Sequence, residues 1–185
     1  PDKAVVYFHG CSVNYYEPHV AEAAIWVLKR NGFETIIPEQ VCCGMPFLDG
    51  GDIESARKNA RKNVHSLKAA AARGEKVVVP QPTCSYVLKN EYPLLVPGED
   101  ARSVAAATMD IFEYLASRKA LGTLNTDFPG KAPGRVSYQM PCHLRAQNMG
   151  FKTRDVLQAV PGTTVSVIEK CTAMDGTWGM KKEYF

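Results

Sequence analysis

The sequence predicts an α/β protein made of two Rossmann-like pseudo-repeats with parallel sheets. The first observation is that short apolar, β-rich runs alternate with segments whose apolar residues recur at helical spacing. Such alternation, with short connections, is typical of parallel strands joined by right-handed crossovers. The second observation is that a strand-turn-cysteine pattern occurs twice in the chain. The third is that cysteines follow the predicted strands, which puts them at strand carboxyl-terminal ends, where such sheets bind ligands.

The individual elements follow from local patterns. The run from Lys3 to Gly10 has the composition of a buried parallel strand ended by glycine. Asn31 and Gly32 supply the stop signal of the helix that follows. Between Ile53 and Arg73 the apolar residues share one helical face, and the opposite face is basic. We interpret this basic face either as a solvated surface or as a contact for an acidic partner or an anionic membrane. The first half is therefore predicted to contain, in order, a strand over 3–10, a helix over 19–29, a strand over 33–37, a helix over 53–73, a strand over 75–79, a helix beginning near 86 and a helix over 102–119.

The internal repeat defines the expected domain organisation. Val136-Ser-Tyr-Gln-Met-Pro-Cys142 imitates Val5-Val-Tyr-Phe-His-Gly-Cys11, and Cys171 corresponds to Cys42. A counterpart of Cys84 would fall beyond the last residue, so we expect an incomplete second repeat and a fragment of a longer protein. The predicted division is a first repeat over 1–121, a linker rich in Gly and Pro over 122–134, and a second repeat over 135–185.

Composition narrows the class of protein. With 185 residues, 45% hydrophobic and 22% charged, the chain has an ordinary globular composition. Its apolar runs are far shorter than the ~20 residues of a membrane-spanning helix, and no secretory signal opens it. We therefore expect a cytoplasmic protein or one bound peripherally to the inner face of the cytoplasmic membrane. A net charge of +3 is too balanced to indicate nucleic acid as a partner.

Cysteine is the unusual feature of the sequence, because a chain of this size needs no disulfide staples. Four thiols come from three predicted strand ends in the first half, and adjacent cysteines need a special turn to face one site, which Gly44 permits. An iron-sulfur cluster takes four thiolates, and so does zinc, so spacing alone leaves both open. A vicinal disulfide switch is a further alternative. The candidate ligands are Cys11, Cys42, Cys43, Cys84, Cys142 and Cys171.

Four segments of the chain resemble the cysteine-rich domains called CCG domains. These are Phe8-His-Gly-Cys-Ser-Val-Asn14, the run from Cys42-Cys-Gly to Asp52, Pro82-Thr-Cys84 and Pro141-Cys-His-Leu-Arg145. The family includes iron-sulfur subunits of anaerobic glycerol-3-phosphate dehydrogenase and of lactate- and glycolate-oxidising complexes, and the B subunit of heterodisulfide reductase. The resemblance covers nearly the whole chain.

The resemblance implies a function as well as a fold. It implies that the chain is a component of an oxidoreductase complex, relaying electrons between a flavoprotein and a quinone or disulfide acceptor, rather than a self-sufficient enzyme. The implied cofactor is an iron-sulfur cluster of the [4Fe-4S] type. The cysteines by themselves leave a zinc-stabilised structural or assembly module as the alternative. The implied partners are a flavin-containing dehydrogenase subunit, a ferredoxin-like iron-sulfur domain or subunit, and menaquinone.

The sequence departs from the family pattern at two positions, and these departures reduce the number of ligands expected at each site. The fullest pattern ends Cys-x-x-Cys, but here Val87 stands three residues after Cys84 and removes a fifth ligand. Cys11, Cys42, Cys43 and Cys84 are thus expected to hold a first cluster. Cys142 and Cys171 are expected to belong to a second, incomplete site, because Thr172 replaces its second vicinal cysteine. The expected supporting residues are His9 and His143, which can hydrogen-bond a cluster sulfur, and Arg145, a contact for an anion or a quinone carbonyl.

Overall fold

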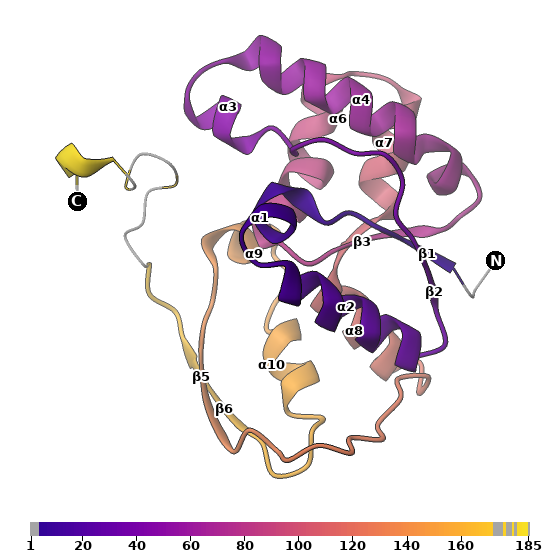
Figure 1. Cartoon of the computed structure of the whole chain (residues 1–185), viewed down its shortest axis with the longest axis vertical. Coiled ribbons are helices and arrows are strands. Elements are labelled where there is room, and N and C mark those ends of the chain that lie inside the picture. The colour runs from indigo at the N-terminus through magenta and orange to yellow at the C-terminus, as the bar shows by residue number, and fades with distance from the viewer. Residues whose placement is uncertain (1–3, 172–175, 177–178, 180, 185) are drawn as a thin grey trace.

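The computed structural model describes residues 4–171, 176, 179 and 181–184, and within them the protein is an α/β protein with two parallel sheets (Figure 1). The larger sheet has the strand order β2-β1-β3-β4 and every neighbouring pair in it is parallel. The smaller sheet is the parallel pair β5-β6. The strands are β1 (Ala4–Tyr7), β2 (Glu34–Ile36), β3 (Lys76–Val79), β4 (Thr108–Asp110), β5 (Arg135–Gln139) and β6 (Thr164–Ile168).

Helices cover both faces of the larger sheet. Residues alternate in direction along a strand, so Val77 and Val79 of β3 pack against one helical layer while Val78 packs against the other. The first layer contains α4 (Ile53–Ala72), α6 (Tyr92–Leu95) and α7 (Glu99–Ala107), and the second contains α2 (Pro18–Arg30) and α8 (Ile111–Ala120). This three-layer arrangement explains why β1 and β3 read as continuous apolar runs.

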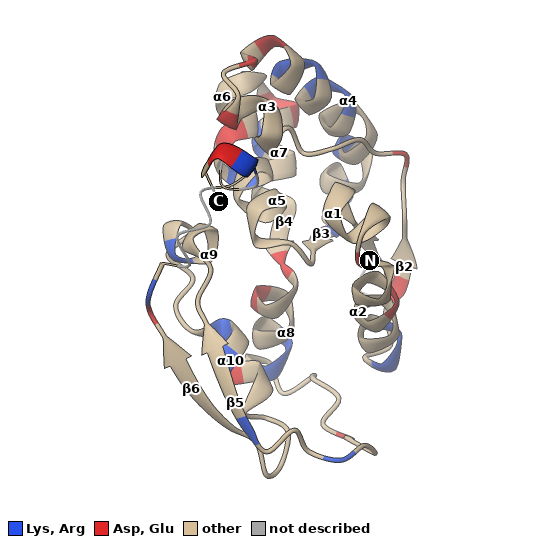
Figure 2. Ribbon diagram, turned by 60° about the vertical axis from the view of Figure 1, so that its left-hand side comes forward, with Lys and Arg blue, Asp and Glu red and all other residues tan. Residues whose placement is uncertain are grey.

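The longest helix, α4, follows from its sequence. Asp52 precedes it and accepts a hydrogen bond from the Ser55 backbone N–H at 3.0 Å, which caps the first turn. Its buried residues recur at helical spacing, while Arg61 and Lys62 are exposed on its outer face, where Figure 2 shows basic residues gathered. No helix in the described part of the chain is both long enough and apolar enough to cross a membrane.

The structure confirms the predicted strands and the helices near 19–29 and 53–73, but corrects the end of the first half. The single helix predicted over 102–119 is wrong, because β4 interrupts it between α7 and α8. Thr108 and Asp110 of this strand are buried, and Asp110 caps α8. Three residues are too few to show a strand period between two helices. The helix expected near residue 86 begins earlier, as α5 (Pro82–Tyr86), and continues through the π-helix η1 (Val87–Glu91) into α6.

The second half packs on the first at two places. Its helix α9 (Cys142–Ala146) contacts α5, and α10 (Lys152–Leu157) contacts α8. The connecting segment is held to the end of α2 by an ion pair of 2.8 Å between Arg30 and Asp127. Close to the chain end, η3 (Lys182–Tyr184) is a short 3-10 turn. The Rossmann-like repeat and its boundaries at 121 and 135 stay predictions.

Candidate functional site

The candidate site lies where the strand order of the larger sheet reverses, between β1 and β3. From β1 the chain crosses to β2 on one side and then returns to place β3 on the other side. Loops that leave two such strands diverge, and the space between their carboxyl ends is the usual ligand position of an open parallel sheet. Cys11 lies in α1 (Gly10–Tyr15), just after β1, and Cys84 lies in α5, just after β3. The sheet topology therefore brings these two cysteines to one crevice.

Four cysteine sulfurs form a chain of contacts at this edge. The Sγ atoms of Cys11 and Cys42 are 3.6 Å apart. The Cys43 thiol hydrogen-bonds with those of Cys42 and Cys84, which completes the chain. Cys43 and Cys84 are buried, whereas Cys11 and Cys42 are partly exposed. The chain of thiols therefore runs from the protein interior, at Cys84 and Cys43, to the surface, at Cys42 and Cys11.

Burial and mutual contact raise the pKa of three of these thiols, those of Cys11, Cys42 and Cys43. Burial raises the pKa of Cys11, and the neighbouring Cys42 adds to the effect. The hydrogen bond with Cys43, followed by burial, raises the pKa of Cys42. For Cys43, the hydrogen bond with Cys42 lowers the pKa, but Cys84 and burial outweigh it and the net direction is upward. Because metals and clusters bind thiolates, loading this site must release protons.

Two glycines allow the cysteines to approach one another. Gly44 has φ of +105° and starts α3 (Met45–Asp49), so the chain turns sharply directly after Cys42 and Cys43. Gly10 has φ of +67°, and a Cβ on it would lie 2.8 Å from the Cys84 Sγ. Only a residue without a side chain fits there, which identifies Gly10 as a part of the site that the sequence did not single out.

A buried asparagine holds the backbone of the vicinal pair. Asn63 of α4 has no exposed surface, and its side chain bonds the main chain at Val41 and Cys42, while Asn59 donates to the same Cys42 carbonyl at 3.1 Å. Sequence reasoning missed Asn63. The sequence does carry a signal for it, because Asn63 stands next to Val64 on the apolar face of the predicted helix. A polar side chain buried at such a position needs a hydrogen-bond partner in the core.

The two remaining cysteines are exposed and belong to the second half. Cys142 is the first residue of α9, and Cys171 follows β6. Thr172, on which the prediction of an incomplete second site partly depends, lies outside the described residues. Among the described residues, no three His, Cys, Asp or Glu side chains are arranged to hold a single metal ion.

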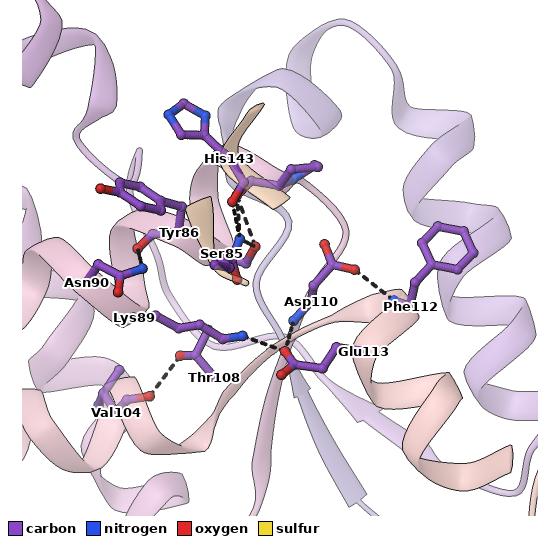
Figure 3. A network of polar contacts seen from close by, with 12 residues as sticks. Ser85, Tyr86, Lys89, Asn90, Val104, Thr108, Asp110, Phe112, Glu113 and His143 are labelled. Atoms are coloured by element: carbon purple, nitrogen blue, oxygen red, sulfur yellow. Dashed lines mark hydrogen bonds and ion pairs between the residues drawn. The ribbon is translucent and has the colours of Figure 1, made fainter. Parts of the chain in front are cut away.

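The expected supporting residues have different positions. The His9 ring places Nδ1 2.7 Å from the Gly10 carbonyl oxygen. His143 places Nδ1 2.9 Å from the Thr83 Oγ1, so it contacts the residue before Cys84. Arg145 is exposed on α9. Gln147, the residue directly after α9, donates to the Ser85 Oγ at 2.9 Å, and Figure 3 shows His143 close to Ser85.

Comparison with known proteins gives a consistent set of relatives. The CCG cysteine-rich domain matches residues 5–89. The C subunit of anaerobic glycerol-3-phosphate dehydrogenase of Escherichia coli is 33% identical over 98% of this chain and 46% of its own length. The B subunit of fumarate reductase (CoM/CoB) of Methanothermobacter marburgensis is 30% identical over 97% of this chain and 34% of its own. Lactate utilization protein A of Geobacillus thermodenitrificans is 26% identical over 94% of this chain and 73% of its own.

The chain spans less than half the length of the first two of these relatives. Their names place them in a dehydrogenase and a reductase, each as one subunit of several. No solved structure matches the chain.

Proposed function

Residues 5–89 belong to the cysteine-rich (CCG) domain family, and from this premise we propose that the chain is an iron-sulfur electron-transfer component of an oxidoreductase complex. The observation that carries the proposal is the chain of four contacting thiols at the crevice between β1 and β3. Relatives named as dehydrogenase and reductase subunits support redox chemistry at such a site. Zinc has no redox chemistry of its own, so the same thiols holding zinc would serve only structure.

The donor set suits an iron-sulfur cluster. Thiolates are the protein ligands of such clusters, and four are enough for a [4Fe-4S] cluster. In the proposal Cys11, Cys42, Cys43 and Cys84 provide them, and the bound cluster accepts and returns single electrons. Val87 is fully buried beside these residues, where it contributes an apolar wall instead of a fifth thiolate.

The chain's own residues define how the site meets its surroundings. Cys43 and Cys84 lie in the apolar core, which shields that side of the site from water. Cys11 is partly exposed, and it lies in the same helix as the exposed Tyr15. We propose that electrons enter or leave through this exposed side, because a partner can approach the sulfurs closely only there.

The partners follow from the same premise. We propose a flavin-containing dehydrogenase subunit on one side of the electron path, and a ferredoxin-like iron-sulfur domain or subunit together with menaquinone or a disulfide on the other. We also propose that Cys142 and Cys171 contribute to a second cluster site in the repeat that begins at residue 135. His9, His143 and Arg145 are proposed as residues around the two sites.

The test is to purify the protein anaerobically and to measure iron, acid-labile sulfide and zinc in the same sample. We expect iron and sulfide in comparable amounts and a brown colour that bleaches on reduction. Iron-sulfur content with no zinc would support the proposal. A colourless protein containing stoichiometric zinc would replace it with the structural alternative, and a protein containing neither would overturn both.

A further inference from the structure

Asn63 and Tyr92 form a buried hydrogen-bonded pair near the cysteine site. Asn63 also bonds the backbone of Cys42, and Tyr92 lies in α6, which continues from α5, the helix of Cys84, through η1. Neither residue has any exposed surface. The Asn63 Nδ2 lies 2.7 Å from the Tyr92 hydroxyl oxygen. It also donates to the carbonyl oxygens of Val41 at 3.1 Å and Cys42 at 3.4 Å.

The orientation of the Asn63 amide is fixed by its other neighbours. Its Oδ1 lies 2.9 Å from the Val41 backbone nitrogen, which can only donate. The side-chain oxygen must therefore face Val41, and the side-chain nitrogen must face Tyr92. Since that nitrogen is a donor only, the Tyr92 oxygen accepts. It follows that the hydroxyl proton of Tyr92 is not used in this bond and points elsewhere.

The surroundings of the Tyr92 hydroxyl contain the cysteine site. Tyr92 starts α6, directly after the π-helix η1, and it shares one buried cluster with Cys43 and Cys84. Burial raises the pKa of its hydroxyl well above the usual range, and the three thiols of Cys43, Cys84 and Cys42 act in the same direction. The hydroxyl thus keeps its proton. Within the part of the chain that the structure describes, the only hydrogen bond of the Tyr92 hydroxyl is the one that it accepts from Asn63.

A buried hydroxyl proton without an acceptor is energetically costly, and Cys43 and Cys84 of the four-cysteine site lie in the same buried cluster as Tyr92. Resting on the function proposed above, we infer that the Tyr92 hydroxyl donates a hydrogen bond to sulfur at the loaded four-cysteine site. Asn63 positions the Tyr92 hydroxyl toward the sulfur, because its one side-chain amide bonds both the hydroxyl oxygen and the backbone of Val41 and Cys42. Tyr92 is in this sense a positioning residue that sets the reduction potential.

The direction of the effect follows from charge. Reduction adds one negative charge to the site, and a hydrogen bond to the more negative form is stronger. The Tyr92 hydroxyl therefore stabilises the reduced state more than the oxidised state, which raises the potential. Hydrogen bonds to cluster sulfurs are among the established determinants of that potential.

The test compares Tyr92→Phe with Tyr7→Phe in the protein reconstituted anaerobically with iron and sulfide. Both changes remove only a buried hydroxyl. Tyr7 is a matched control because it is fully buried in β1, its hydroxyl has no hydrogen-bond partner among the described residues, and it faces the opposite helical layer. The measurements are iron and sulfide content, melting temperature, the midpoint potential from a redox titration, and the Fe–S stretching frequencies after reconstitution in H2O and in D2O.

We expect Tyr92→Phe to load the cluster and to lower the equilibrium constant for reduction about tenfold, which is about 59 mV for a one-electron couple. The deuterium shift of the Fe–S frequencies should shrink in this variant, while Tyr7→Phe should match the unmodified protein in both measurements. If Tyr92→Phe lowered the melting temperature but left the potential and the frequencies unchanged, the hydroxyl would serve packing alone and the inference would fail with the proposed function intact. If the unmodified protein took up no iron and sulfide, both would be overturned.

Should Tyr92→Phe fail to load, Asn63→Asp provides the second measurement. Its carboxylate cannot donate to the Tyr92 oxygen and instead accepts the hydroxyl proton, so it should draw that proton away from the sulfur. We expect this variant also to lower the potential. An unchanged potential in Asn63→Asp would contradict the inference.

Discussion

His143 Nδ1 lies 2.9 Å from Thr83 Oγ1, and this contact connects the second half of the protein to the first. Each of the two residues is next to a cysteine in the sequence. His143 follows Cys142, and Thr83 precedes Cys84. The same imidazole stacks on Tyr86, with ring centroids 5.0 Å apart and planes at 28°. The side chain that the sequence suggests as a hydrogen-bond donor to a cluster sulfur therefore also contacts α5 from α9.

The first prediction concerns this contact. His143→Ala removes one hydrogen bond and one ring contact, which together should lower the stability of the second half by roughly 1–2 kcal/mol. Hydrogen exchange should become faster in α9 and β5 while β1 and β3 stay protected. His65→Ala is the control, because His65 is exposed on α4. Equal exchange in both variants would show that the contact does not hold the halves together.

The second prediction separates the two cysteine sites. Cys43→Ser removes a ligand from the centre of the four-thiol chain, so it should abolish most iron and sulfide binding and lower the melting temperature together, since cluster binding contributes folding free energy. Cys171→Ser should have a smaller effect, because Cys171 is exposed and lies in the second half. Full iron content in Cys43→Ser with loss in Cys171→Ser would reverse the assignment.

The third prediction tests the close approach of two loops. Gly10 and Gly122 both have φ of +67°, so an alanine at either position costs about 1 kcal/mol of backbone strain. A Cβ at position 10 meets the Cys84 sulfur at 2.8 Å, whereas one at position 122 meets nothing within 4 Å. Gly10→Ala should therefore reduce iron and sulfide content, and Gly122→Ala should only lower the melting temperature. Unchanged iron in Gly10→Ala would contradict this geometry.

The fourth prediction concerns a buried carboxyl group at the end of β4. Burial raises the pKa of Asp110 to about 7, although its carboxylate accepts from the Phe112 N–H and an ion pair of Lys89 with Glu113 lies nearby (Figure 3). Between about pH 4 and 7 the folded protein holds a proton that the unfolded chain releases. The free energy of unfolding contributed by Asp110 therefore falls as pH rises through this range.

Asp110→Asn should remove that dependence and still cap α8. From pH 5 to 8, we expect the unmodified protein to lose about 3 kcal/mol more than the variant in urea unfolding followed by circular dichroism. Asp52→Asn is the control, because Asp52 also caps a helix but is exposed and has a lowered pKa. Parallel pH profiles for the Asp110 variant and the unmodified protein would exclude a proton on Asp110.

Several features were predictable because they depend on residues close together in the chain. The strands β1 and β3 are apolar runs ended by glycine or proline, and α2 and α4 show their buried faces as a spacing of apolar residues. β4 was not predictable, since its three residues form a strand only by pairing with β3. The pairing partner is distant in the sequence, and no local pattern encodes it.

The sequence by itself determined the class of fold, the match of residues 5–89 to the cysteine-rich (CCG) domain and the cysteines that follow the strands, because each of these is carried by residue identity and short spacing. Only the tertiary structure decided which thiols touch, since the order β2-β1-β3-β4 sets which strand ends are neighbours. It also decided that His143 faces Thr83 and that Asn63 bonds Tyr92. Contacts between residues 60 and 29 positions apart depend on how whole layers pack, and packing is a property of the folded chain.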